Sequence, residues 1–316
     1  MSIGIGIDIS KDKVDVASSD GRWSAVFPQT GAGLQELAQT VAAMGPHRVV
    51  LEASGGYERE VLVALSLEKL PVVLVQPIRA KHFIKGMGRR AKTDAIDARS
   101  LAQMAMVGVD DAPLWQPLDR DVAELRALVQ RRQQLVLHQD NEKKRRRGAT
   151  AAVLESIERA VQFVKEELHA IEKQINALVS CVPALETAVA TLETVRGVGR
   201  VTATSLVVFV PELGRVDRAA IASLVGVAPM NNESGQWKGQ RVIQGGRPDA
   251  RKVLYMAALA AVSHNETLKT FYAGLRAKGK PGKVALVACM RKLLVHLNSK
   301  MRAHLTAGTA VEIALG

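Results

Sequence analysis

The chain has 316 residues, with 43 Lys or Arg against 31 Asp or Glu and a formal net charge of +12 at pH 7. Hydrophobic residues make up 47% and charged residues 23%, an ordinary globular composition that excludes wholesale disorder. Two cysteines are too few for a disulfide scaffold or a zinc cluster. The longest strictly apolar run, residues 254–262, is far shorter than a bilayer span, and the N-terminus lacks a secretory pattern. We therefore expect a cytoplasmic protein with no membrane partner.

The positive charge is concentrated in the last third of the chain. Residues 1–110 hold 13 basic and 12 acidic side chains, residues 111–190 hold 12 of each, and residues 191–316 hold 18 and 7. A net charge of +11 in one segment is typical of a surface that binds a polyanion, and nucleic acid is the first expectation. A basic domain that binds an acidic protein is the alternative.

Residues 1–112 are predicted to form an α/β domain. Ile3, Ile5 and Ile7 alternate with glycines, and the alternation resumes after a turn, which indicates a β-hairpin. Further strands are predicted over 48–52 and 71–75, and helices over 34–41 and 57–67. Strands that alternate with helices favour a sheet covered by helices.

Residues 113–190 have the pattern of long helices. Apolar residues at intervals of three and four between Val153 and Leu178 form one stripe along a helix, which needs a partner surface. The partner is either a helix over 122–136 in the same chain or a coiled coil with another copy. A run of five cations separates the helices, and it is either an exposed helix end or a contact for nucleic-acid phosphates; it comprises Lys143, Lys144, Arg145, Arg146 and Arg147.

Residues 191–316 are predicted to form a mainly helical domain. It begins with Arg196-Gly197-Val198-Gly199-Arg200 between two helical patterns. Such a turn resembles a helix-hairpin-helix, in which backbone N–H groups at a helix start bind a DNA phosphate without reading sequence.

Four acids of the first domain are predicted to converge. Asp8 ends the first strand and Glu52 ends a buried strand, while Asp94 and Asp97, three residues apart, share one helix face. Close carboxylates repel one another unless cations neutralise them, and oxygen ligands favour Mg²⁺ or Mn²⁺. Two such ions support cleavage of a phosphodiester. Taken singly, each acid also has a structural explanation: Asp8 as a turn cap, Glu52 as an ion-pair partner and Asp94 as a helix cap.

The order of these acids is that of a ribonuclease-H-like core. Gly-Ile-Asp-Ile-Ser-Lys around Asp8, Leu-Glu-Ala-Ser-Gly-Gly-Tyr-Glu from Leu51, and Lys-Thr-Asp-Ala-Ile-Asp-Ala-Arg from Lys92 resemble the DEDD transposases of the IS110 family, relatives of the Piv DNA invertase. The C-terminal motifs Gly-Val-Ala-Pro from Gly226, Glu-Ser-Gly from Glu233, Gly-Gly-Arg from Gly245 and Arg-Lys-Val-Leu from Arg251 extend the resemblance over nearly the whole chain.

The resemblance implies a RuvC-like, ribonuclease-H-type domain over 1–112, a helical coiled-coil region over 113–190 and a C-terminal transposase domain over 191–316. It implies that Asp8, Glu52, Asp94 and Asp97 bind the metal and that Ser234 is the nucleophile. It further implies double-stranded donor and target DNA as substrates, a structured non-coding guide RNA, called a bridge RNA, and a homo-oligomer, either a dimer or a tetramer.

Cations around Ser234 are the predicted contacts to nucleic-acid phosphates. They are Lys238, Arg241, Arg247, Arg251 and Lys252, together with Arg196 and Arg200 beside Gly197 and Gly199. Lysines 278–283 are interpreted instead as a solvated surface. Only eleven residues are aromatic, few for a protein that reads bases by stacking, which fits a guide RNA that chooses the sequence.

Three other functions remain open on sequence alone. A ribonuclease-H-like nuclease or Holliday-junction resolvase would use the same acids with water as the nucleophile. A sugar kinase or ATPase would share the first strand and its Asp, but the chain lacks a Gly-x-x-x-x-Gly-Lys-Ser/Thr loop, and no ATP requirement is expected. A nucleic-acid scaffold would need no metal.

Overall fold

The computed structural model describes residues 2–87, 94–110, 112–230, 233–234, 237–238 and 242–307. The chain divides into two compact units, the first ending at Pro117 and the second beginning at Leu118. The long helices between residues 118 and 190, which the sequence predicts as a region of their own, lie in the same compact unit as the C-terminal helices.

The first unit is built on a five-stranded mixed sheet in the order β3-β2-β1-β4-β5. Its strands are β1 (Gly4–Ile9), β2 (Lys13–Ser18), β3 (Ser24–Pro28), β4 (Arg48–Glu52) and β5 (Val72–Val75). β2 runs antiparallel to β1 and β3, whereas β4 runs parallel to β1 and β5. The predicted hairpin and both later strands are confirmed, and the mixed sheet is the core expected of a ribonuclease-H-like domain.

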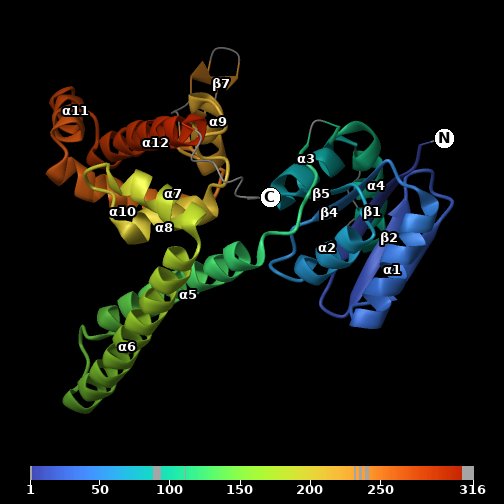
Figure 1. Ribbon diagram of the computed structural model, residues 1–316, viewed down its shortest axis with the longest axis horizontal. Helices are drawn as coiled ribbons and strands as arrows, with labels where there is room; N and C mark the ends of the chain where they lie inside the picture. Colours follow the sequence, from blue (N-terminus) through green and yellow to red (C-terminus); the bar gives the residue numbers. More distant parts are fainter. Residues whose placement is uncertain are drawn as a thin grey trace. The chain divides into compact units, whose positions relative to one another are not determined.

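Helices cover both faces of this sheet (Figure 1). One face packs on α1 (Gly31–Met44) and α2 (Glu58–Leu67), with Ile5, Ile7 and Leu51 fully buried between the layers. The other face packs on α3 (Pro77–Gly86) and α4 (Asp94–Val107) through Val50 and Val73. Burial on both faces explains why β4 and β5 are continuous apolar runs rather than alternating ones.

The second unit begins with two long antiparallel helices, α5 (Arg120–Arg145) and α6 (Ala151–Cys181). Val129 on α5 and Val164 and Ile175 on α6 are buried along the stripe predicted from the sequence. Arg132 Nε donates to Glu172 Oε1 across the pair at 2.7 Å. The stripe therefore packs within the chain, as the intramolecular alternative required.

A helical bundle completes the second unit. Its helices are α7 (Pro183–Glu193), α8 (Arg200–Phe209), α9 (Arg218–Val225), α10 (Pro248–His264), α11 (Glu266–Ala277) and α12 (Gly282–Thr306). Between α9 and α10 lie the short strands β6 (Pro229–Met230), β7 (Glu233–Ser234), β8 (Trp237–Lys238) and β9 (Val242–Ile243). α12 packs against α7, α9, α10 and α11 through buried residues that include Leu293 and Leu297.

No single helix of the described ranges is long and apolar enough to cross a membrane; α6 and α7 reach that length and composition only as a pair, bent by 110°. Cys181 and Cys289 are both free thiols, and burial raises the pKa of Cys289.

Candidate functional site

Asp8 and Glu52 lie side by side where β1 and β4 end. The parallel pairing places Ile7 opposite Leu51, so the next residues along the two strands are these acids. Asp8 shares a sheet face with Gly6, and Glu52 shares one with Val50, because alternate residues of a strand point to the same side. Val50 packs on the α4 side, so both partly buried carboxyl groups belong to that face.

Two glycines allow α4 to lie directly on β1. A Cβ atom at Gly6 would stand 2.0 Å from the Ala98 carbonyl oxygen, and one at Gly4 would stand 2.8 Å from the Ala102 carbonyl oxygen. A residue further along β1 therefore faces a residue nearer the start of α4: Gly4 faces Ala102, whereas Gly6 faces Ala98. Two strand residues span about 6.6 Å and one helical turn about 5.4 Å, so the next residue on this face, Asp8, lies level with the first turn of α4. That turn carries Asp97.

The backbone thus brings Asp8, Glu52 and Asp97 to one end of the sheet. Asp94 begins α4, and its side chain lies outside the described part. Among described side chains, no group of three or more His, Cys, Asp or Glu is assembled for a metal ion. The donor chemistry, carboxylate oxygen alone, fits a hard divalent cation. A metal site formed by Asp8, Glu52, Asp94 and Asp97 stays a prediction.

A further acid, Asp15, stands directly across the β1–β2 pair from Asp8. It is buried, at 7% exposure, and its Oδ2 is 2.9 Å from Lys13 Nζ. Directly opposed residues of an antiparallel pair share a face and interact. Asp15 was missed in the sequence, although the predicted hairpin register could have paired it with Asp8.

The loop after Glu52 is held by Glu58. Its Oε2 accepts hydrogen bonds from Ser54 N at 3.0 Å, Ser54 Oγ at 3.1 Å and Gly56 N at 2.8 Å. Burial alone would raise the pKa of Glu58, but these donors and its own backbone N–H outweigh burial and lower that pKa. The carboxylate therefore fixes the chain immediately beyond a predicted metal ligand.

Ser234 lies in the second unit, on β7, where it pairs with Trp237 of β8. Lys238 is the other residue of β8, and Arg241 lies outside the described residues. The chain enters this segment through β6 and leaves it through β9, which pair antiparallel with Pro229 opposite Ile243. The entry and the exit of the Ser234 segment therefore lie side by side, next to the helical bundle.

Two family models match the sequence. The DEDD transposase model of IS110 matches residues 5–155, and the model of the transposase IS116/IS110/IS902 family matches residues 189–273. The chain belongs to the IS110 family of DEDD transposases.

Two curated relatives of this transposase are the pilin gene-inverting proteins of Moraxella lacunata and Moraxella bovis. Each is 27% identical over 300 residues, which cover 92% of both chains. Among solved structures, RuvC of Thermus thermophilus is 16% identical and covers 34% of the transposase and 97% of its own chain, with a TM-score of 0.28. The same protein in complex with a Holliday junction substrate is 14% identical, with equal coverage and TM-score.

Several predicted phosphate contacts of the transposase bind its own groups. Arg200 donates to Glu186 at 2.6 and 3.0 Å, and these hydrogen bonds lower the pKa of Glu186 and raise that of Arg200. Arg247 donates to Glu212 at 2.5 and 2.6 Å. Lys252 Nζ is 3.3 Å from Asp249 Oδ1. A role of these cations in binding nucleic acid stays a prediction.

The basic run of the transposase lies at the end of α5, with all five side chains exposed. Arg146 pairs with Glu158 at 3.0 Å, Lys143 donates to Gln139 at 2.7 Å, and Arg145 pairs with Glu142. For Lys144 and Arg147, no ion pair is made within the ranges that the structure describes.

The Gly-x-Gly turn joins α7 to α8, as the sequence predicted. A Cβ atom at Gly197, which has φ 95°, would stand 2.6 Å from Ala261 of α10, so packing requires this glycine. Gly199 caps α8 and meets nothing within 4 Å, and Arg196 is exposed. A phosphate contact by this turn stays a prediction.

A groove of about 1080 Å³ lies beside the base of the Ser234 segment. Its apolar lining includes Pro229, Ile243, Phe271 and Val287. Every charged residue that lines it is a cation: Arg218, Lys283, Arg291 and Lys292. Lys292 Nζ lies 4.5 Å from the centroid of the Phe271 ring. Sequence reasoning missed this surface because five elements far apart in the chain form it.

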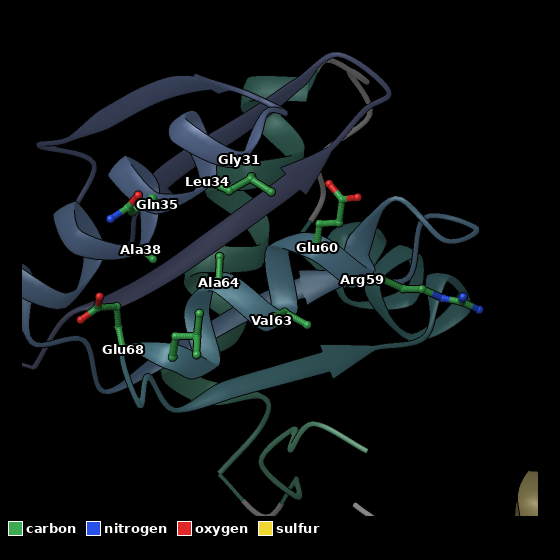
Figure 2. Close-up of a pocket in the computed structure, with 10 residues that line it drawn as sticks. Gly31, Leu34, Gln35, Ala38, Arg59, Glu60, Val63, Ala64 and Glu68 are labelled. Atoms are coloured by element: carbon green, nitrogen blue, oxygen red, sulfur yellow. The ribbon is translucent and has the colours of Figure 1, made fainter. Parts of the chain in front are cut away.

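A second groove, of about 660 Å³, lies between α1 and α2 of the first unit. Figure 2 shows Arg59 and Glu60 at one end of it and Glu68 at the other. These helices cover the sheet face opposite α4, so this groove is separate from the acids.

Proposed function

We propose that this IS110-family transposase cleaves and rejoins DNA through a covalent bond to Ser234. The observation that carries the proposal is the placement of Asp8, Glu52 and the first turn of α4 at one end of the mixed sheet. The serine segment of the second unit, in the matched C-terminal family region, supplies the nucleophile. The two sets of residues would act together on one phosphate, within one chain or between copies.

The acids would hold two divalent ions, Mg²⁺ or Mn²⁺. When bound, divalent cations neutralise the carboxylates and polarise the scissile phosphate. Asp8 and Glu52 would bind from neighbouring strands and Asp94 and Asp97 from α4. Glu58 would keep the loop beyond Glu52 in place.

Ser234 Oγ would attack phosphorus, forming a phosphoserine bond as the bond to the departing strand's oxygen breaks. The serine proton leaves to solvent or a base, and the departing oxygen gains a proton. The hydroxyl of another strand then attacks the phosphoserine and releases the serine. One phosphodiester is exchanged for another, so no ATP is consumed. The Moraxella relatives are named pilin gene-inverting proteins, and this name supports a reaction that rejoins DNA.

We further propose that a structured non-coding RNA selects the donor and target DNA. The support is the net charge of +11 over residues 191–316, with only eleven aromatic residues in the chain for base stacking. Sequencing the nucleic acid that copurifies with the protein tests this. A single structured RNA encoded beside the gene is expected, and bulk cellular RNA alone would contradict it.

The protein would act as a dimer or tetramer. Phe163 on α6, which is 61% exposed, offers an apolar contact between copies. Light scattering of the purified complex measures its mass, and a monomeric complex on DNA would contradict the assembly.

Trapping the covalent intermediate tests the main proposal. The full chain and its copurified RNA are incubated with Mg²⁺ and a plasmid that carries the insertion element together with its flanking DNA. The products are then resolved in a denaturing gel. Wild type should form an adduct and Ser234→Ala none, while DNA binding stays unchanged. Cleavage by Ser234→Ala without an adduct would instead indicate a nuclease that uses water.

A further inference from the structure

The entry and the exit of the Ser234 segment cross at van der Waals distance. Gly226 ends α9 with φ 75°, and Gly246 precedes α10 with φ 68°. A Cβ atom at Gly246 would stand 2.3 Å from Gly226 N, and one at Gly226 would stand 2.3 Å from the Gly245 carbonyl oxygen. Because these obstacles are backbone atoms, the crossing tolerates no side chain. The β6–β9 pair begins three residues beyond Gly226 and ends three before Gly246.

An ion pair anchors this crossing to the bundle. Both Glu212 oxygens accept from the Arg247 guanidinium, at 2.5 and 2.6 Å, and the same guanidinium donates to the Phe209 carbonyl oxygen at 3.0 Å. The two side chains are only 31% and 30% exposed. Arg247 N also donates to the Leu224 carbonyl oxygen of α9 at 3.0 Å. One residue therefore links the exit strand to both α8 and α9.

A second arginine spans the crossing from the α10 side. Arg251 Nη1 contacts the carbonyl oxygens of Gly245, Val225 and Gly226, the last two at 3.5 Å. These are the backbone groups that meet where entry and exit touch. Through this one nitrogen, the Arg251 side chain joins both ends of the segment.

We infer that Glu212, Arg247 and Arg251 form a clamp that sets the position of Ser234, so that they act as positioning residues and not as ligands of DNA. The inference rests on the proposed function, because it assigns the clamp to the serine that attacks. It assigns the Gly-Gly-Arg and Arg-Lys-Val-Leu motifs to the geometry of the nucleophile. Displacing a reacting group by about 1 Å lowers the reaction rate about 100-fold. Loosening the crossing at the start of the Ser234 segment should therefore produce a measurable loss of rate.

Glu212→Gln separates positioning from DNA binding. Removing an acid frees Arg247 for phosphate, so DNA affinity should stay equal or increase, and its dependence on salt should not weaken. The rate of Ser234 adduct formation in a single turnover should nevertheless fall by about 10- to 100-fold, because the bidentate anchor is lost. Glu212→Gln combined with Arg247→Gln should be no slower than the slower single variant, since both remove one interaction.

The matched control is Glu172→Gln, which breaks the Arg132–Glu172 pair of the α5–α6 hairpin and should leave the adduct rate unchanged. If Glu212→Gln does not fold, Glu212→Asp keeps the charge and shortens the reach, and it should show the same loss of rate with a native unfolding temperature. Adduct formation within twofold of wild type in the folded variant overturns the clamp, as does a parallel loss of DNA affinity. Absence of any adduct in the wild type overturns the proposed function, and the clamp with it.

Discussion

Replacing Gly6 by alanine tests the placement of α4 on the sheet. The added methyl carbon would stand 2.0 Å from the Ala98 carbonyl oxygen and 2.1 Å from Ala102 N, whereas ordinary contact begins at 3.4 Å. Both obstacles are helix backbone, which no rotamer change can move. The helix must therefore withdraw by about 1.4 Å, and its first turn, with Asp97, must move away from Asp8.

Forced overpacking of this kind costs about 1–3 kcal/mol, and backbone obstacles place this substitution at the upper end. For a unit of about 100 residues, about 3 kcal/mol lowers the unfolding temperature by roughly 12–24 °C. A displacement of about 1 Å also lowers the catalytic rate about 100-fold. Gly4→Ala should be milder, because its nearest contact would be 2.8 Å.

Calorimetry of the full chain measures the unfolding temperature. Mn²⁺ titration measures the metal affinity of the site, and the adduct assay measures its reaction rate. Gly86→Ala is the control, since Gly86 lies on α3 with nothing within 4 Å, and it should be neutral or slightly stabilising. A Gly6→Ala variant with the unfolding temperature and Mn²⁺ affinity of the wild type would refute the packing of α4 on β1.

Three further predictions concern charge. Arg291→Gln at the groove should weaken DNA binding and reduce the slope of log K against log salt by about 1, and an unchanged slope would remove Arg291 from the interface. Glu58→Gln should speed amide hydrogen exchange at Ser54 and Gly56, whose N–H groups lose a charged acceptor; unchanged protection would contradict its role. Burial would raise the pKa of Glu212, but the hydrogen bonds and charge of Arg247 lower it below its ordinary value of 4.5. The ion pair therefore stabilises the fold above pH 4.5, and this stabilisation is lost as the pH falls below 4.5. The unfolding temperature of the second unit should stay constant from neutral pH to about pH 5 and should decrease below pH 4.5. The decrease should be less steep in Glu212→Gln, and an identical decrease in wild type and variant would contradict the linkage.

Much of the first unit follows from local patterns. The alternation around Ile5 and the apolar runs at 48–52 and 71–75 predict the strands, and strand order then brings Asp8 beside Glu52. The sequence could not show that Gly4 and Gly6 support α4, since that depends on which face a distant helix covers. Asp15 was missed because its importance comes from register rather than from a motif.

The roles of the cations could not be predicted from the sequence. Arg247 and Lys252 look alike in the sequence, yet one is bound bidentately to Glu212 and the other is exposed beside Asp249. Their carboxylate partners differ in distance along the chain, 35 residues for Arg247 and three for Lys252. Long-range pairs of this kind, like the groove around Arg291, appear only once the helices are packed.

The most direct measurement of the account is the identity of the residue joined to DNA. Adducts are trapped on wild-type protein, digested with trypsin and nuclease, and sequenced by mass spectrometry. The tryptic peptide 219–238 contains two serines, Ser223 and Ser234, so fragmentation must separate them. The account predicts a nucleotide on Ser234. A nucleotide on any other residue, or cleaved DNA with no linked peptide, would contradict it.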